Sequence, residues 1–319
     1  MRPALEVIVP GLHTTVQDSG RFGYQEIGVP ASGPLDRISL RLANALVGNP
    51  PGTPALEMLL QGPTLKVMAE SVRLALVGCN AGVEIRSGNS RIVPAGRSVR
   101  LTRDEVFRIG SLRDSVCAYL AIEVGPDIPP VLGSASTYVR GAIGGFHGRR
   151  LQASDFVLLK LADVNVRDEY ALPRPLDLAL DQPIRVVLGP QADYFTDGAM
   201  KAFLSSDYTV SPQADRMGYR LEGPILAHCK GYNIVSDGTV AGAIQVPGSG
   251  LPIVLMVDNQ TTGGYPKIAT VISADIPIIG RRRPGRRIRF VAVGVDEAEL
   301  LRREQEAAIR LEVEELSAL

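Results

Sequence analysis

Short apolar runs recur along the chain between glycines and prolines. The clearest runs lie at 72–78, 116–125, 184–190, 252–258 and 288–294. Runs of this length, bounded by turn-forming residues, are typical of strands that are buried on both faces. The 33 glycines and 23 prolines add frequent turns, which favours a barrel or sandwich over a doubly wound α/β sheet. The pattern therefore predicts a mainly β protein.

Three segments have a helical pattern instead. In the segment 34–49, Pro34 lies near the expected start of a helix and Gly48 lies where a C-terminal cap is expected. Apolar side chains repeat along one face of this helix (Leu35, Ile38, Leu42 and Leu46). Residues 190–204 repeat apolar side chains at a spacing of four (Phe195, Ala199 and Phe203). The tail from Asp296 is rich in Glu, Arg, Leu and Ala, so we expect a third helix there.

The length of 319 residues suggests two domains. Prolines and acidic residues interrupt the apolar pattern at 164–183, which is typical of a domain boundary. We expect one domain over 1–174 and a second over 175–319, the latter with a C-terminal helix.

Charge and cysteine content narrow the choice of partner and compartment. Lys plus Arg and Asp plus Glu both number 34, so the overall charge favours neither nucleic acid nor an anionic membrane as a partner. The cysteines Cys79, Cys117 and Cys229 are scattered, which argues against a zinc site or a disulfide framework. The N-terminus lacks the apolar segment of a signal peptide, and the apolar runs are too short to span a bilayer. We expect a cytoplasmic protein that binds no metal.

The common catalytic signatures are missing from the sequence. There is no glycine-rich dinucleotide-binding motif and no phosphate-binding P-loop. The histidines His13, His147 and His228 lack the spacing of metal ligands. Lys201 follows Ala-Met, as a biotinylated lysine does, but it falls inside an expected helix rather than in a hairpin turn.

Polar, glycine-rich loops remain as candidate sites. The stretch LMVDNQTTGGYPK at 255–267 places a carboxylate, amides, hydroxyls and a lysine directly after an apolar run. Similar loops lie at 14–36 and 211–224. Glycines allow close approach of the backbone to a ligand, and such polar side chains can bind an amide or a carboxylate. Six arginines lie between Arg281 and Arg289 and could bind phosphate or carboxylate groups. Alternatively, this segment is a solvated loop or an edge that faces a partner.

Several ordered motifs resemble those of one family. They are TTVQDSGRFGYQEIGVPASGPLD (14–36), LANALVGN (42–49), LGSASTY (132–138), ADRMGYRLEGP (214–224), SDGTVAGAIQVPGSGLPIVLMVDNQTTGGYPKIATVISAD (236–275) and RPGRRIRF (283–290). Over nearly its whole length the chain resembles the biotin-dependent carboxyltransferase, or allophanate hydrolase subunit 2-like, family. The resemblance is greatest to members that serve as the C-type subunit of 5-oxoprolinase.

The resemblance implies a fold, partners and a choice of reactions. The implied fold is two tandem cyclophilin-like β-barrel domains with a few helices. The implied partners are a subunit 1-like protein, which is the B-type subunit of 5-oxoprolinase, and a third, lactam-utilisation-type subunit. The favoured activity is ATP-dependent opening of the lactam of 5-oxo-L-proline to L-glutamate, with ATP used by the assembled complex. One alternative is carboxyl transfer from carboxybiotin to urea or guanidine; another is a non-catalytic antagonist of a kinase inhibitor.

Residue type and family match together assign roles in the candidate site. Asp258 is expected to act as a base or an orienting acceptor, and Lys267 to neutralise developing negative charge. Substrate-binding residues are expected on the three polar loops and, for Gln245, elsewhere in the motif 236–275: Gln17, Asp18, Arg21, Arg216, Tyr219, Arg220, Gln245, Gln260, Thr261, Thr262, Gly263, Gly264 and Tyr265. Arg286 stands where the family usually has an acidic residue, which adds a cation beside a potential anion site.

Overall fold

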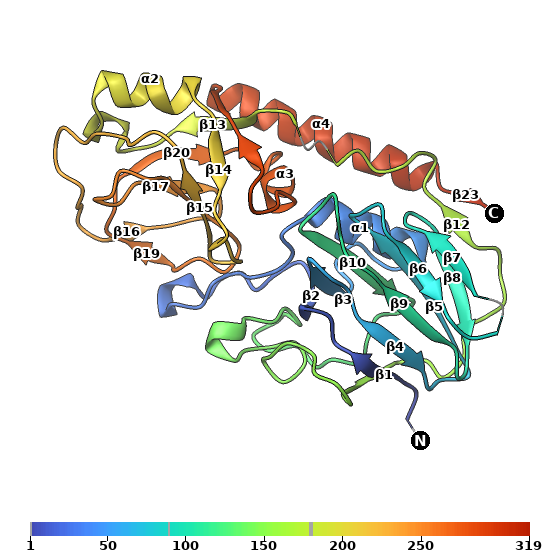
Figure 1. Cartoon of the computed structure of the whole chain (residues 1–319). Helices are drawn as coiled ribbons and strands as arrows, with labels where there is room; N and C mark the ends of the chain where they lie inside the picture. Colours follow the sequence, from blue (N-terminus) through green and yellow to red (C-terminus); the bar gives the residue numbers. More distant parts are fainter. Residues whose placement is uncertain (1, 89, 179–180) are drawn as a thin grey trace. The chain divides into compact units, whose positions relative to one another are not determined.

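The computed structural model describes residues 2–88, 90–178 and 181–319. Contacts between residues divide the chain into two compact units (Figure 1). The first contains the chain up to Arg21, Ser32–Leu178 and Ala308–Leu319, and the second contains Phe22–Ala31 and the described residues from 181 to Ala307. The expected domain boundary between residues 174 and 175 stays a prediction.

Two β-sheets form most of the first unit. The six-stranded sheet has the order β11 (Phe156–Leu158), β1 (Ala4–Val9), β4 (Thr64–Val67), β9 (Val106–Ile109), β6 (Gly82–Ile85), β7 (Arg91–Pro94). The five-stranded sheet has the order β2 (His13–Gln17), β3 (Ala55–Leu59), β10 (Cys117–Ile122), β5 (Ser71–Val77), β8 (Ser98–Thr102). A short pair of strands, β12 (Tyr170–Ala171) and β23 (Ser317–Ala318), joins the end of the chain to this unit.

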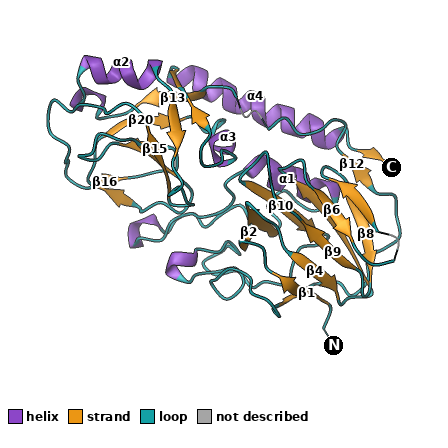
Figure 2. Cartoon of the chain, viewed as in Figure 1, coloured by secondary structure: helices purple, strands orange, loops and turns teal. Residues whose placement is uncertain are grey.

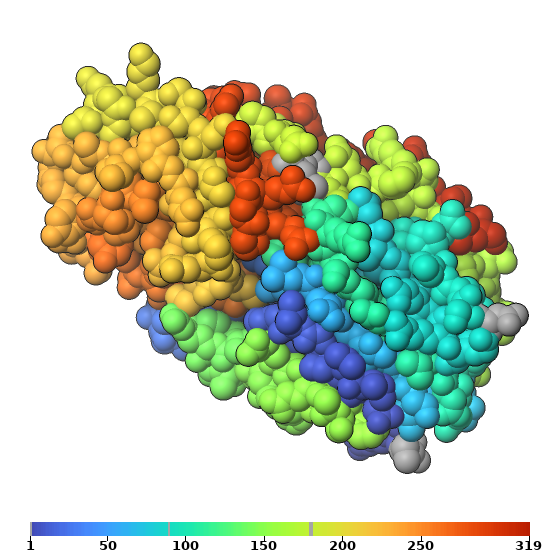
Figure 3. Space-filling model, viewed as in Figure 1, coloured from blue at the N-terminus to red at the C-terminus, as the bar shows by residue number. Residues whose placement is uncertain are grey.

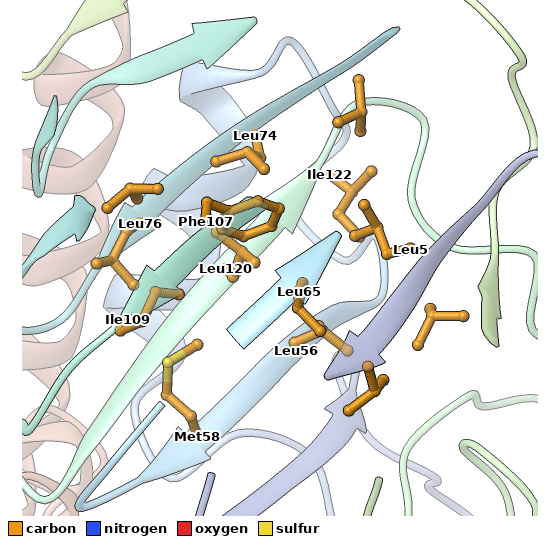
Figure 4. Close-up of a cluster of buried hydrophobic side chains, with 14 of the residues drawn as sticks. Leu5, Leu56, Met58, Leu65, Leu74, Leu76, Phe107, Ile109, Leu120 and Ile122 are labelled. Carbon is orange, nitrogen blue, oxygen red and sulfur yellow. The ribbon is translucent and has the colours of Figure 1, made fainter. Parts of the chain in front are cut away.

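The hydrophobic core of the first unit takes side chains from both sheets. Figure 4 shows this cluster, in which the six-stranded sheet contributes Leu5, Leu65 and Phe107 and the five-stranded sheet contributes Leu56, Leu74 and Leu120. All six are fully buried. Truncation of a side chain such as Phe107 to alanine would cost about 3–5 kcal/mol, because it removes buried apolar contacts and leaves a cavity.

Helix α1 (Arg37–Leu46) covers the five-stranded sheet at β5 and β10. Alternate residues of a strand face opposite sides, so Leu120 faces the core while Tyr119 faces the helix. The Tyr119 hydroxyl accepts a hydrogen bond from the backbone N–H of Asp36 at 2.9 Å, and Asp36 caps the helix by accepting from two backbone N–H groups. Both faces of β5 and β10 are therefore covered, which explains why every residue of these two strands is buried.

The second unit is built on one eight-stranded sheet. Its order is β21 (Arg287–Ile288), β14 (Tyr208–Val210), β15 (Gly218–Glu222), β18 (Ile253–Leu255), β17 (Ala243–Gln245), β20 (Lys267–Val271), β13 (Ile184–Leu188), β22 (Phe290–Ala292). The two outermost strands, β21 and β22, are separated by Arg289 alone. Since a single residue joins the two edges, the sheet curls into a nearly closed barrel.

Shorter elements complete both units. Helices α2 (Asp197–Ser205), α3 (Ile276–Gly280) and α4 (Val295–Glu314) follow strands of the second unit, and the division between the units falls inside α4. A two-stranded ribbon pairs β16 (Asp237–Gly238) with β19 (Thr262–Gly263). Single 3₁₀ turns lie at Gln25–Ile27, Val139–Gly141 and Ala192–Tyr194.

The mainly β class with a few helices is confirmed, as Figure 2 shows. Each of the five apolar runs contains a strand, and α1, α2 and α4 lie within or beside the three segments expected to be helical. Figure 3 shows the surface of the chain, with residues 50–88 in blue to cyan and residues 200–250 in yellow to orange. Among the described residues, no helix is both long enough and apolar enough to cross a membrane.

Candidate functional site

The polar stretch 255–267 folds as a loop between two central strands of the second unit's barrel, here called the second barrel. It leaves β18 at Leu255, forms β19 at Thr262–Gly263 and enters β20 at Lys267. Pairing of β19 with β16 sets Gly263 opposite Asp237 and Thr262 opposite Gly238. A second segment, 237–239, therefore lies against the loop, although the paired residues are 24 and 26 positions apart in sequence.

A cross-strand pair joins Gln245 to Lys267. These residues are direct partners in the pairing of β17 with β20, next to a register shift between Ile244 and Gln245. Directly opposed side chains in an antiparallel pair lie on one face, about 4.5–5.5 Å apart at Cβ. A bulge commonly redirects a side chain toward a functional site. The exposed fractions of Gln245 and Lys267 are only 2% and 5%, so an amide and an ammonium share a buried position.

Gln245 has hydrogen-bonding capacity left over. Its Oε1 accepts from Nε2 of Gln260 at 3.2 Å, whereas its own Nε2 is buried and has no partner among the described residues. A buried donor without a partner is costly, and a ligand oxygen would satisfy it. A Cβ atom on Gly263 would stand 2.3 Å from this nitrogen, which explains why a glycine lies beside it.

Lys267 is paired with an acidic residue that the sequence analysis did not select. Its Nζ donates to Oδ2 of Asp237 at 2.6 Å and to the carbonyl of Gly238 at 3.4 Å. The hydrogen bond from Lys267, aided by the backbone N–H of Gly238, lowers the pKa of Asp237 below its usual value. The side chain of Asp237 is 55% exposed, so Lys267 joins the buried cluster to the surface.

Asp258 has a different partner. Both of its carboxylate oxygens accept from the guanidinium of Arg216, at 2.8 Å from Nε and 3.1 Å from Nη2, and both residues are buried. The backbone N–H of Asp258 also donates to the carbonyl of Arg216 at 2.9 Å. This two-pronged pair ties the loop to the residues before β15, so its geometry favours the orienting role of Asp258 over that of a base.

A polar network fixes the rest of the loop. Nδ2 of Asn259 donates to Oγ1 of Thr239 at 3.1 Å and to the carbonyl of Gln260 at 2.8 Å, and the Thr239 hydroxyl donates to the same carbonyl. The backbone N–H of Thr239 donates to the carbonyl of Thr261 at 3.0 Å. Thr262 and Tyr265 are exposed, and the carbonyl of Gly264 accepts from the N–H of Ile234.

Tyr219 and Arg220 do not act together. They are neighbours on β15, so their side chains point to opposite faces of the sheet. Tyr219 is buried and its hydroxyl donates to the carbonyl of Gly280 at the end of α3 (3.1 Å), whereas Arg220 is exposed. The hydrogen bond of Tyr219 therefore connects strand β15 to the end of helix α3.

The three candidates from the first unit hold a different loop. Asp18 accepts from the hydroxyls of Ser134 and Ser136 and from the backbone N–H groups of Ala135 and Gly20. Arg21 donates to the carbonyls of Val131, Ser134 and Ser136 at 2.8–3.3 Å. Gln17 donates from Nε2 to the carbonyl of Thr137 at 3.1 Å. All three thus fasten the segment 131–137, which contains most of the LGSASTY motif.

The structure therefore assembles one compact cluster in the second unit, made of Gln245, Gln260, Gly263, Lys267 and Asp237. Five residues of these networks were not predicted from the sequence: Asp237, Thr239, Asn259, Ser134 and Ser136. Asp237 lies in the motif 236–275, but its link to Lys267 depends on the pairing of β16 with β19, which a sequence does not reveal. Within the described ranges, no three His, Cys, Asp or Glu side chains are grouped as metal ligands.

Comparison with known proteins places the chain in a family. The family described as "Carboxyltransferase domain, subdomain A and B" matches residues 27–292. The chain is 37% identical to the C-type subunit of 5-oxoprolinase from Escherichia coli (strain K12), over 95% of each chain. It is 33% identical to urea amidolyase of Saccharomyces cerevisiae over 96% of its own length but 18% of that protein.

A solved structure agrees with these sequence relationships. The crystal structure of the K. lactis urea amidolyase superposes with a TM-score of 0.87 and 30% identity, over 98% of this chain and 20% of that one. This chain thus spans about a fifth of the urea amidolyases and nearly the full length of the 5-oxoprolinase relative. The chain belongs to the carboxyltransferase domain family, subdomains A and B.

Proposed function

We propose that this chain is the C-type subunit of an ATP-dependent 5-oxoprolinase complex, which opens the lactam of 5-oxo-L-proline to L-glutamate. The relationship to the bacterial 5-oxoprolinase subunit extends over 95% of both chains, which supports the role of that subunit for this chain. The proposed partners are a subunit 1-like protein, the B-type subunit, and a third, lactam-utilisation-type subunit. ATP hydrolysis by the assembled complex drives the reaction.

The observation that carries the proposal is the unpartnered amide nitrogen of Gln245 beside the ammonium of Lys267. A lactam carbonyl oxygen gains negative charge when its carbon is attacked. Nε2 of Gln245 is a donor for this oxygen, and Lys267 stabilises its charge, most effectively because both groups are buried. Lys267 and Gln245 are thus the proposed catalytic residues.

Neighbouring residues shape and orient this site. Gln260 holds the Gln245 amide in place through its hydrogen bond, and Gly263 leaves room for the amide beside the backbone. Thr261, Thr262, Gly264 and Tyr265 form the outer part of the loop and are proposed to contact the substrate carboxylate. Asp258 and Arg216 are proposed as positioning residues that fix where the loop starts.

Two observations support the carboxyltransferase alternative. They are the match to the carboxyltransferase domain family and the TM-score of 0.87 to a urea amidolyase. In that reaction the same donors would polarise the carbonyl of urea or the amidine of guanidine while carboxybiotin supplies the carboxyl group. The relatives compared above give no support to an antagonist of a kinase inhibitor.

Reconstitution separates the two reactions. The chain is co-expressed with its subunit 1-like and lactam-utilisation-type partners, and the purified complex is assayed for glutamate formed from 5-oxoproline and for ATP hydrolysed. In parallel it is given urea or guanidine with carboxybiotin. Glutamate formation that requires this chain supports the proposal. Carboxylation of urea or guanidine with no glutamate formed would replace it with the carboxyltransferase function.

A further inference from the structure

A groove lies where the second barrel closes. β21 pairs with β14 and β22 pairs with β13, so Arg289, which joins β21 to β22, lies at the seam of the barrel. The residues just before β13 and β14 meet the segment 285–289 there and surround a volume of about 490 Å³. The groove is lined by Asp181, Gln182, Pro183, Asp207 and 285–289.

Positive charge exceeds negative charge in this groove. Three guanidinium groups line it, those of Arg286, Arg287 and Arg289, against the carboxylates of Asp181 and Asp207. Asp207 pairs with Arg289 at 2.8 Å and lies 3.8 Å from Arg287. Arg286 has no hydrogen bond or ion pair from its side chain to any described residue, so its exposed guanidinium can bind a ligand.

A fourth arginine lies buried behind the wall of the groove. Arg282 is 1% exposed, and Nη2 donates to the carbonyl of Gln182, a lining residue, at 2.8 Å. Nε and Nη1 are buried and have no partner among the described residues. Burial, and to a lesser extent the charge of Arg286, lowers the pKa of Arg282, while Asp181 opposes that shift.

We propose that this groove is a binding site for a phosphate group, either free or at the end of a larger small molecule. A buried arginine with two unused donors and no carboxylate bonded to it is costly to the fold. A phosphate offers oxygens with two negative charges, which match the excess of guanidinium groups, and arginine binds phosphate in two-pronged fashion. The site is separate from the Gln245–Lys267 cluster and does not depend on the reaction of the complex.

Binding is measured by isothermal titration calorimetry on the full chain at 0.15 M ionic strength, with inorganic phosphate, pyrophosphate and ADP. We expect one site per chain with a Kd below about 1 mM for at least one of these. Arg286→Gln removes the unpaired guanidinium at the surface and is expected to raise that Kd about tenfold or more. Arg303→Gln removes an exposed arginine on α4 that pairs with Glu299, and as the matched control it leaves the Kd within about twofold.

A second variant tests the buried arginine. Arg282→Met removes the buried charge, so we expect a melting temperature no lower than that of the parent chain and a loss of the stabilisation by phosphate. If this variant does not fold, Arg286→Gln decides the matter. Tighter binding of ADP or pyrophosphate than of phosphate would identify a larger phosphate-bearing ligand. Absence of binding at 5 mM, an unchanged Kd in Arg286→Gln, or equal binding of succinate would overturn the proposal.

Discussion

Gln245 and Lys267 are direct partners across two central strands of the second barrel, and both are almost completely buried. The lysine is neutralised by Asp237 from a separate ribbon, whereas Nε2 of the glutamine has no partner among the described residues. The fold thus holds a charged group and an unused donor side by side. This arrangement suits a site in which a carbonyl oxygen becomes negative.

Lys267→Met is expected to lower kcat of the reconstituted complex about 10²-fold while KM changes less than about threefold. Loss of one preorganised electrostatic donor typically has an effect of this size, and it falls on the transition state. Steady-state kinetics measure both constants. Lys201→Met, the same change at an exposed lysine of α2, is the control and should be fully active. A normal kcat in Lys267→Met would remove the lysine from the chemistry.

Arg216 and Asp258 are expected to contribute mainly to stability. Asp258→Asn leaves the buried guanidinium of Arg216 without its carboxylate, which should cost about 3–5 kcal/mol of unfolding free energy. Arg216→Lys should also destabilise, since one ammonium cannot replace the two-pronged contact. Urea unfolding measures these changes. As a control, Arg103→Ala breaks a largely exposed pair with Glu70 and should cost less than about 1 kcal/mol.

Asp18→Asn is expected to loosen the segment 131–137 in the first unit. The amide nitrogen of asparagine cannot accept the hydrogen bonds that the carboxylate takes from Ser134, Ser136 and Ala135. We expect a loss of about 2–3 kcal/mol and faster amide hydrogen exchange across this segment. Asp114→Asn is the control, because among the described residues this carboxylate accepts a single hydrogen bond, from the N–H of Asn80. Unchanged exchange in Asp18→Asn would show that the loop is held by other contacts.

Alkaline pH should destabilise the chain, in part through Cys79. Burial raises the pKa of this thiol to about 12, because the thiolate is poorly solvated there. The unfolded thiol titrates near pH ~8.5, so the contribution of Cys79 is fully present below that pH and is lost as pH rises toward the folded value. Cys79→Ala should therefore flatten the fall in melting temperature above pH ~8.5. The exposed Cys229, changed to alanine, should not alter it.

Many strands could be predicted from local patterns, because a strand that is buried on both faces has apolar residues at most of its positions. The runs at 72–78 and 116–125 are β5 and β10, which α1 covers on one side and the core on the other. The exact helix ends needed the structure: α1 begins at Arg37 because the side chain of Asp36 caps it, so Pro34 lies just before the helix. The strand β23 at the end of the tail depends on pairing with β12, far away in sequence.

The candidate site was predicted only in part, for a similar reason. The polar loop 255–267 was recognisable from its mixture of residue types, and it does carry Gln260, Gly263 and Lys267 into the cluster. Which ions pair was not predictable. Asp258 and Lys267 lie nine positions apart in one loop, yet Asp258 pairs with Arg216 and Lys267 pairs with Asp237, because strand pairing and not sequence distance determines the neighbours.

The most direct test of the site is the turnover of Gly263→Ala against Gly264→Ala in the reconstituted complex. A Cβ at Gly263 stands 2.3 Å from Nε2 of Gln245, whereas a Cβ at Gly264 meets its nearest atom at an ordinary 3.5 Å. Because the Gln245 side chain can turn away, both variants should fold with melting temperatures close to the parent's.

Gly263→Ala displaces the amide of Gln245 and should therefore lower kcat for glutamate formation by at least about tenfold. Gly264→Ala should stay within about twofold of the parent. Equal turnover in the two variants, with both folded, would contradict the assignment of the Gln245–Lys267 cluster as the site of reaction.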